Sequence, residues 1–229
     1  AVQRWYGFTP PSPAILADAV YGLSEWCNGG MAGAALVANP GCYPTSILLA
    51  LKPLVDRLDP SQPVVCDAKS GTSGAGRRSD AAYGFSELDG NVRAYGAGTH
   101  RHEPEIRQAL NLPAVTPFIF VPHLLPMVRG ILSTIYVAFS RPLGDAELME
   151  SYEAAYASAS FVRVLPPGRL PELRRVVGTP YAEIGFARLD EGRRAVLVCV
   201  IDNLLKGAAS QAVQNFNRMF GLPEEEGLR

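Results

Sequence analysis

The sequence predicts an α+β fold, on two observations. Apolar runs typical of buried strands recur along the chain, and between them lie segments whose apolar residues repeat at helical spacing. These two kinds of segment do not alternate regularly, as a doubly wound parallel sheet requires. The 229 residues, of which 48% are hydrophobic and 19% charged, are enough to bury a sizeable core.

The first half of the chain begins irregularly. The N-terminal segment is rich in Pro, Gly and aromatic residues, with one short helix expected at 14–23 and a short buried strand at 34–38. A helix follows the turn at Cys42, because apolar residues then recur at helical spacing. These residues are Ile47, Leu48, Leu51, Leu54, Val55 and Leu58. A strand at 64–68 and a loop of small residues at 70–78 come next.

The second half continues with shorter elements. Pro104 favours a helix start, and Asn111 and Pro113 stop that helix after residue 110. Further strands are expected at residues 118–121, 131–139, 161–165 and 195–201, and further helices at 146–158 and 204–220. The last helix ends at Gly221 and has an apolar face made of Leu205, Ala208, Ala209, Ala212, Val213, Phe216 and Phe220.

Composition excludes several classes of protein. A net charge of −1 gives no reason to expect nucleic acid or an anionic membrane as a partner, and no apolar run approaches the ~20 residues that span a bilayer. The four cysteines form no Cys-x-x-Cys pair, so we expect no metal site and a reducing, cytoplasmic compartment. Cys66 and Cys199 lie in strand-like runs, and Cys27 lies in a polar turn. Because the chain begins without Met, we expect an upstream portion.

The hexapeptide Asn39-Pro40-Gly41-Cys42-Tyr43-Pro44 is the most informative motif. It places the Cys42 thiol at the start of a helix, where unpaired backbone N–H groups and the helix dipole favour an anion. Such positions lower a cysteine pKa from about 8.5, which makes the thiol a nucleophile. The alternative from the motif alone is a small apolar residue at a helix cap.

A cysteine nucleophile needs an acid or base partner. His102 precedes the predicted helix and Glu105 falls in its first turn, so the carboxylate can reach the imidazole, fix its tautomer and raise its basicity. A solvated helix cap is the alternative. In the loop at 70–78, exposed backbone N–H groups would let a phosphate or a cofactor ring approach. Arg77, Arg93 and Arg129 are possible anchors for a carboxylate or phosphate.

Five motifs in order over almost the whole chain resemble the N-acetyl-gamma-glutamyl-phosphate reductase family of arginine biosynthesis. They are Asn39-Pro40-Gly41-Cys42-Tyr43-Pro44-Thr45, Asp67-Ala68-Lys69-Ser70-Gly71-x-Ser73-Gly74-Ala75-Gly76-Arg77, His100-Arg101-His102-x-Pro104-Glu105, Pro122-His123-Leu124-x-Pro126-Met127-x-Arg129-Gly130 and Asp202-Asn203-Leu204-x-Lys206-Gly207-Ala208-Ala209. Trp5-Tyr6-Gly7-Phe8 also matches a segment that the family carries before its active site.

The resemblance implies an NADPH-dependent reduction of a small acyl phosphate. It assigns Cys42 as the nucleophile that forms a thioester, His102 as the acid and base, and Glu105 as the group that holds the ring of His102. His100, Arg77 and Arg129 would bind substrate, and Ser70, Gly71, Ser73, Gly74 and Asn203 would lie near the nicotinamide of NADP(H).

The resemblance also implies a mixed, largely antiparallel sheet with helices on one face, of the glyceraldehyde-3-phosphate dehydrogenase-like C-terminal domain type. Residues 1–38 would be the tail of a dinucleotide-binding domain, 39–203 the catalytic and dimerisation domain, and 204–229 a C-terminal helix packed on the dinucleotide-binding domain. Most of the NADP(H) site would lie on the absent N-terminal part, and the protein would form a homo-oligomer, a dimer or tetramer.

Four other interpretations compete with this one. The related aminoadipyl-phosphate reductase of lysine biosynthesis shares the motifs, and aspartate-semialdehyde dehydrogenase is a more distant relative, against which the Cys42 and His100–His102 motifs count. A cysteine hydrolase or amidase would use Cys42 and His102 without a nicotinamide site. A non-catalytic oligomerisation module would pair through the strand at 131–139 and would require an unreactive Cys42.

Overall fold

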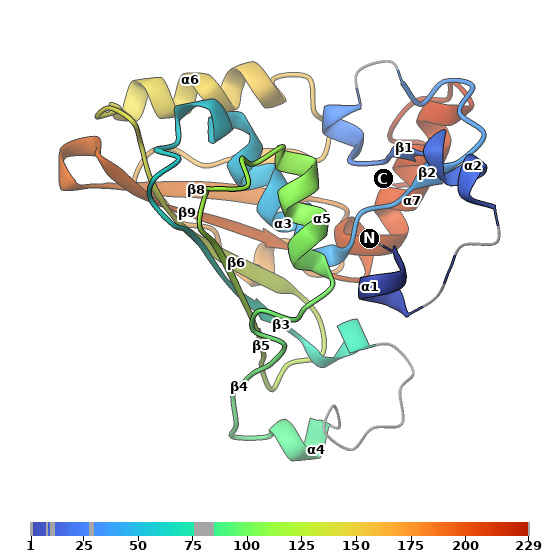
Figure 1. The fold of residues 1–229 in the computed structure, drawn as a ribbon, viewed down its shortest axis with the longest axis horizontal. Coiled ribbons are helices and arrows are strands. Elements are labelled where there is room, and N and C mark those ends of the chain that lie inside the picture. The colour runs from blue at the N-terminus through green and yellow to red at the C-terminus, as the bar shows by residue number, and fades with distance from the viewer. Residues whose placement is uncertain (1, 8, 10–11, 28–29, 76–84, 229) are drawn as a thin grey trace.

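The computed structural model describes residues 2–7, 9, 12–27, 30–75 and 85–228 (Figure 1). Its main sheet contains strands β3 Val64–Ser70, β4 Arg93–Ala94, β5 Phe118–Leu124, β6 Ile131–Ala138, β7 Val162–Val164, β8 Ala182–Leu189 and β9 Arg194–Ile201. Their order is β4-β5-β3-β6-β9-β8-β7. β3 pairs with β5 and β7 with β8 in parallel, and the other neighbours are antiparallel. The predicted mixed, largely antiparallel sheet is confirmed.

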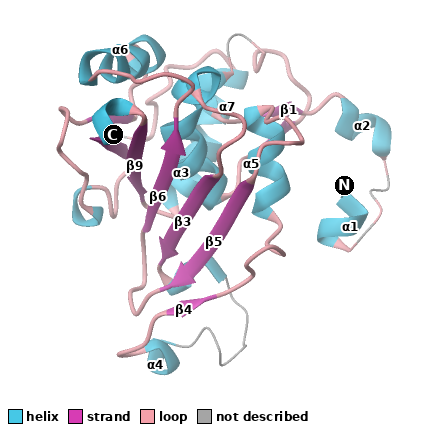
Figure 2. Ribbon diagram, turned by 60° about the vertical axis from the view of Figure 1, so that its left-hand side comes forward, coloured by secondary structure: helices cyan, strands magenta, loops and turns pink. Residues whose placement is uncertain are grey.

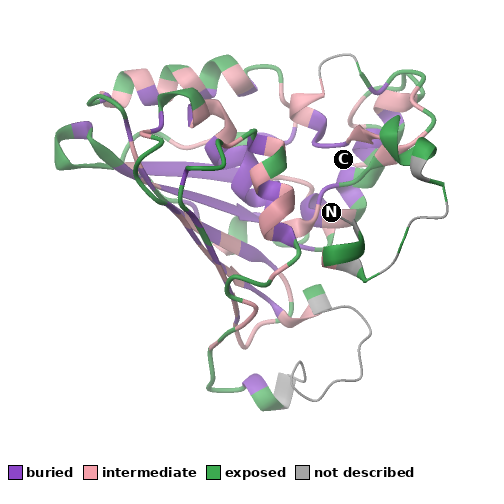
Figure 3. Ribbon diagram, in the orientation of Figure 1, coloured by how far each residue is buried: buried purple, intermediate pink, exposed green. Residues whose placement is uncertain are grey.

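Helices cover one face of this sheet, as predicted. They are α3 Cys42–Leu51, α5 His102–Leu110 and α6 Asp145–Tyr156 (Figures 1 and 2). The core between these layers contains Phe120, Ile135 and Leu197, and the sheet is buried along its middle (Figure 3). Among the described residues, no helix is long and apolar enough to cross a bilayer.

α3 is buried on all sides, from its second residue to its last. A helix that is apolar all round needs neighbours all round, and α3 has the sheet beneath it and α5 beside it. From α6, the hydroxyls of Tyr152 and Tyr156 donate to the carbonyls of Ala50 and Leu49 at 2.7 and 2.5 Å. The helix that begins at Cys42 is therefore a rigid element.

The remaining elements lie beside the sheet. A two-stranded parallel sheet joins β1 Val20–Tyr21 to β2 Val37–Ala38. The short helices are α1 Val2–Tyr6, α2 Pro13–Ala17 and α4 Phe85–Leu88, and the chain ends with a π-helix at Leu205–Ala209 that continues into α7 Ser210–Met219.

Two predictions of secondary structure were wrong. The helix expected at 14–23 stops at Ala17, and β1 follows, because Val20 and Tyr21 pair with β2. β8 was not predicted, although its residues alternate in part between apolar and other types. Gly185 in its centre weakens the strand pattern, and here the glycine is needed because the backbone of residue 169 lies 2.3 Å from where its Cβ would be.

α7 buries its polar side. Gln211, Gln214, Asn215 and Asn217 are buried, whereas Phe216 is 52% and Phe220 64% exposed. The buried amides donate hydrogen bonds to carbonyls that no strand satisfies: Gln211 and Asn215 both donate to Gly22 O. The apolar face identified in the sequence is thus the outer face of this helix.

Candidate active site

Cys42 is the first residue of α3, directly after the N-cap Gly41. Its backbone N–H and that of Tyr43 favour the thiolate, as expected at a helix start. Burial has the larger effect and raises the pKa of Cys42 to about 11. The lowered pKa expected from the sequence is therefore wrong for this chain, because the packing around half-buried Cys42 disfavours the thiolate more than the helix start favours it.

Two glycines bring other groups against the nucleophile. A Cβ at Gly41 would lie 2.5 Å from Nε2 of His102, so the imidazole packs on the backbone of the residue before Cys42. A Cβ at Gly207 would lie 2.8 Å from Cβ of Cys42, so the π-helix packs on the nucleophile itself. In both cases glycine is required by close approach, because any side chain would displace these groups.

His100 and His102 form an aromatic cluster with Tyr43. The two imidazoles lie 4.7 Å apart, and the ring of Tyr43 lies 5.8 and 5.9 Å from them. Nδ1 of His100 accepts the backbone N–H of His102 at 3.2 Å. Burial, with a further contribution from Arg101, lowers the pKa of His100 to about 4. Burial, followed by the charges of His100 and Arg101, lowers the pKa of His102 to about 3. Both rings are neutral at pH 7.

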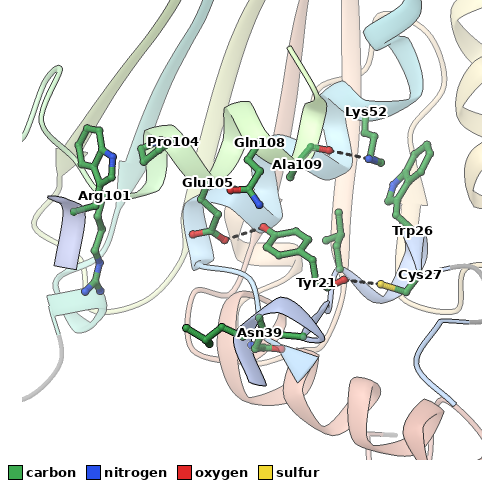
Figure 4. A pocket seen from close by; sticks show the side chains of 15 residues that line it. Tyr21, Trp26, Cys27, Asn39, Lys52, Arg101, Pro104, Glu105, Gln108 and Ala109 are labelled. Atoms are coloured by element: carbon green, nitrogen blue, oxygen red, sulfur yellow. Dashed lines mark hydrogen bonds between the residues drawn. The ribbon is translucent and has the colours of Figure 1, made fainter. Parts of the chain in front are cut away.

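Glu105 does not hold His102, which corrects the expected pairing. Its Oε1 accepts the backbone N–H of Gly41 at 2.9 Å. The same atom accepts the hydroxyl of Tyr21 at 2.8 Å (Figure 4). Nδ1 of His102 is buried and has no hydrogen-bond partner among the described residues. The backbone N–H of Gly41 has no partner within α3, and the carboxylate of Glu105 bonds this N–H instead of the imidazole of His102. Tyr21 was not anticipated from the sequence.

The loop after β3 donates its N–H groups inward. Gly71, Thr72 and Ser73 donate to the carbonyls of residues 130, 127 and 128 at 2.9, 2.9 and 3.1 Å. Gly71 is needed here, because its Cβ would lie 2.6 Å from the carbonyl oxygen of Val128. The expected row of exposed N–H donors is therefore wrong for these three residues.

Asp202 and Asn203, after the end of β9, bond both the loop after β3 and the Arg129–Gly130 segment that packs on it. Asn203 accepts the N–H of Gly130 at 2.6 Å and donates to Oγ of Ser73 at 3.0 Å. Asp202 is fully buried and pairs with Nε of Arg129 at 3.1 Å. Arg129 is thus oriented by Asp202, the first residue of the motif Asp202-Asn203-Leu204, for which the sequence indicates no function. Arg77 lies outside the described residues.

The residues predicted to bind NADP(H) fit one part of such a site. Oγ of Ser70 donates to the carbonyl of Gly71 at 2.9 Å, and Ser73 and Asn203 bond each other, so these groups form a fixed wall. Gly74 on that wall is exposed, and a Cβ there would lie 3.4 Å from Oγ of Ser70. The backbone N–H groups of residues 71–73 are engaged within the chain, so they offer no free donors to a dinucleotide phosphate. Among the described residues, no three His, Cys, Asp or Glu side chains gather as a metal site.

A pocket of about 630 Å³, lined in part by Glu105, lies between α5 and residues 19–27 (Figure 4). Tyr21, Trp26, Lys52 and Glu105 are among its lining residues, and Cys42 is not. Two of its polar groups are already engaged within the chain: Lys52 donates to Ala109 O at 2.9 Å, and Sγ of Cys27 donates to Tyr21 O at 2.7 Å.

The fold is shared with solved dehydrogenases. Aspartate semialdehyde dehydrogenase II from Vibrio cholerae is similar with a TM-score of 0.68 and 19% identity, over 88% of this chain and 68% of that one. A probable aspartate-semialdehyde dehydrogenase from Pseudomonas aeruginosa gives 0.68 and 18%, over 92% and 70%.

Residues 42–203 match the family model "Semialdehyde dehydrogenase, dimerisation domain". The fold and the cysteine site thus define a domain of the semialdehyde dehydrogenase class. The N-acetyl-gamma-glutamyl-phosphate reductase of Geobacillus thermodenitrificans is 48% identical over 99% of this chain and 67% of its own length, and that of Halorhodospira halophila 49% over 98% and 66%. The chain belongs to the N-acetyl-gamma-glutamyl-phosphate reductase family and spans about two thirds of the length of these relatives.

Proposed function

We propose that this chain is the catalytic part of an arginine-biosynthesis reductase. The reaction is the NADPH-dependent reduction of N-acetyl-glutamyl 5-phosphate to N-acetyl-glutamate 5-semialdehyde, with release of phosphate. The observation that carries the proposal is the seating of Cys42 at the start of a buried helix with the neutral imidazole of His102 packed against its turn. The names of its relatives, which are 44–49% identical, support the choice of substrate.

The first step uses the proton on sulfur. With the pKa of Cys42 near 11 and that of His102 near 3, the resting pair is a thiol and a neutral base. As the sulfur attacks the acyl carbon, His102 accepts its proton, and phosphate leaves without needing protonation. The product is a thioester on Cys42.

The second step reduces the thioester carbonyl. Ser70, Gly74 and Asn203 would hold the nicotinamide of bound NADPH, which would supply the hydride for this step. His102 returns its proton to the carbonyl oxygen, and the same ring serves again when the aldehyde forms and the sulfur leaves. We place the rest of the NADP(H) site on a dinucleotide-binding domain outside this chain, with residues 1–38 as its tail and residues 204–229 packed on it. The exposed apolar face of α7 supports that packing.

Substrate anions would be held by fixed cations and donors. Buried Asp202 orients the guanidinium of Arg129, which remains about one third exposed. It can donate two hydrogen bonds to a phosphate or carboxylate. His100 lies beside His102 and would donate to the phosphate. We keep Arg77 as a further candidate on the sequence motif alone.

The open face of the sheet is the proposed surface for a second copy. Val65 pairs with Ile119 and Tyr136, and Tyr136 pairs with Val196, so these side chains form one apolar strip opposite the helices. Ile119 is 47% and Tyr136 44% exposed. We expect Tyr136→Lys to convert the full-length oligomer toward monomers in sedimentation analysis. Val115→Lys, at an 81% exposed position outside the strip, is the control and should leave the mass unchanged.

The function is tested in the full-length enzyme by the reverse reaction, phosphate-dependent reduction of NADP by N-acetylglutamate semialdehyde. We expect activity that disappears with Cys42→Ala. Activity with only the aminoadipate analogue would move the protein to lysine biosynthesis. Hydrolysis of acyl substrates that needs no NADPH would instead indicate a cysteine hydrolase.

A further inference from the structure

Lys206 and Glu25 form a buried ion pair away from the proposed chemistry. Their side chains are 0% and 1% exposed, and Nζ of Lys206 donates to Oε1 of Glu25. Gln214 of α7 completes the cluster, since its Oε1 accepts from Lys206 at 2.7 Å and its Nε2 donates to Glu25 at 2.9 Å. Oε2 of Glu25 is buried with no partner among the described residues.

Such a pair is poorly explained by stability. Removing two charges from water costs about as much as their attraction returns, and apolar residues of similar volume often replace a buried pair without loss. The cost is increased here by the unpaired carboxylate oxygen of Glu25. A role in fixing local geometry accounts for the pair better.

The geometry that the pair fixes includes the nucleophile. Lys206 lies on the π-helix, and its neighbour Gly207 is the residue whose backbone packs on Cβ of Cys42. The next carbonyl, that of Ala208, accepts from Nδ2 of Asn39 at 3.2 Å, so the π-helix also contacts the segment that leads into Cys42. π-helical turns are rare and occur mostly at functional sites.

Glu25, the other member of the pair, belongs to a segment that is itself bonded to α7. It lies in the 3₁₀ turn Ser24–Trp26, where Ser24 bonds Asn215 and Ser24 O accepts from Arg218. The pair therefore joins the N-terminal segment, the π-helix and α7 into one unit behind Cys42.

We propose that Lys206 and Glu25 are positioning residues for the nucleophile: their ion pair holds the π-helix so that Gly207 packs on Cys42 and Asn203 remains on the nicotinamide wall. The inference rests on the proposed function for its kinetic part. Neither residue touches the reacting atoms, and both act through the π-helix.

The test compares variants of the full-length enzyme. The double variant Lys206→Met with Glu25→Leu removes the charges and keeps an apolar filling, so we expect an unfolding midpoint at or above that of the parent. We expect kcat to fall roughly 10- to 100-fold while KM for the acyl phosphate changes little, because small displacements of reacting groups have effects of that size. The exposed pair Arg141–Glu147, changed to Met and Leu, is the matched control and should leave kcat unchanged.

A second readout does not need the reaction. With the π-helix released, we expect the iodoacetamide rate of Cys42 to rise several-fold over its rate in the parent enzyme. A stable double variant with parental kcat and a parental Cys42 rate would overturn the proposal. If the parent lacks reductase activity, the proposed function fails, and the alkylation rates still decide the positioning role.

Discussion

The carboxylate of Glu105 accepts the backbone N–H of Gly41 at 2.9 Å, and so a residue of α5 fixes the start of α3 one position before Cys42. The same carboxylate also raises the pKa of Cys42 by its negative charge. One side chain therefore has two opposite effects on the nucleophile: it holds the turn in place and disfavours the thiolate.

Substitutions of Glu105 separate these effects. Glu105→Gln keeps an acceptor for Gly41 without the charge, so we expect a lower pKa for Cys42, faster alkylation at pH 8 and little loss of stability. Glu105→Ala leaves the N–H of Gly41 without its acceptor and should cost about 1–3 kcal/mol in the free energy of unfolding. Glu103→Gln, in the same helical turn, is the control. Equal unfolding free energies for the Gln and Ala variants would contradict the anchoring role.

His102→Ala should lower kcat roughly 10²- to 10⁴-fold, as expected for loss of a general acid–base group, and more than Glu105→Gln does. Because the pKa of His102 lies near 3, kcat/KM of the parent should show no acid limb at pH 6.5. His123→Ala is the control, since His123 pairs with Asp67 on β3. A limb at pH 6.5 that disappears with His102→Ala would show that the ring is solvated in the working enzyme.

The pH dependence of Cys42 alkylation tests its burial. A thiol with a pKa near 11 has roughly 300-fold less thiolate at pH 7.5 than a free cysteine with a pKa near 8.5. In this 229-residue chain, the iodoacetamide rate at Cys42 should therefore still be rising at pH 10, as followed by peptide mass spectrometry. A plateau near pH 7 would restore the activated thiolate first expected from the helix start.

Gly41→Ala tests the packing of His102. The new Cβ would lie 2.5 Å from Nε2, so the imidazole must move, and we expect kcat to fall by about 100-fold. Gly30→Ala is the matched control, because nothing lies within 4 Å of its Cβ position. Parental kcat in Gly41→Ala would show that the ring has room to shift without consequence.

Acid should destabilise the domain through the buried imidazole of His102 and the half-buried imidazole of His100. Their folded pKa values, about 4 and about 3, lie below the unfolded value near 6.5, so the unfolded chain binds more protons between these limits. The stabilisation is complete above pH 6.5 and is lost as the pH falls toward 3, by up to about 1.4 kcal/mol per pH unit for His102. Urea unfolding at pH 7, 5.5 and 4.5 measures this slope, which His102→Asn should reduce.

Much of the fold followed from local pattern, because strands such as 64–68 and 195–201 and the helix after Cys42 have clear apolar periodicity. β8 was missed where Gly185 interrupts that periodicity. The outward apolar face of α7 could not be anticipated, since two of its buried amides donate to the carbonyl of Gly22, which is 189 and 193 positions away.

Three residues predicted to form the site lie close together, but their predicted contacts differ from those in the structure. Cys42, His102 and Glu105 do converge on the Gly41 turn, but the acceptor that Glu105 provides is used by a backbone N–H and not by the imidazole. The pKa of Cys42 depends on how deeply the helix start is buried, which is a property of the packed domain. Lys206 was quoted within a motif, and its partner Glu25 lies 181 positions away, so no local spacing could pair them.

The family match begins at Cys42 and ends at Asn203, whereas the groups that pack on the nucleophile reach beyond both limits. Tyr21 and Gly41 lie upstream, and Gly207 lies downstream. A protein trimmed to the matched segment would keep every strand of the main sheet and would lose these supports of its reactive sulfur. The packed surroundings of Cys42 are therefore larger than the segment that the family model matches.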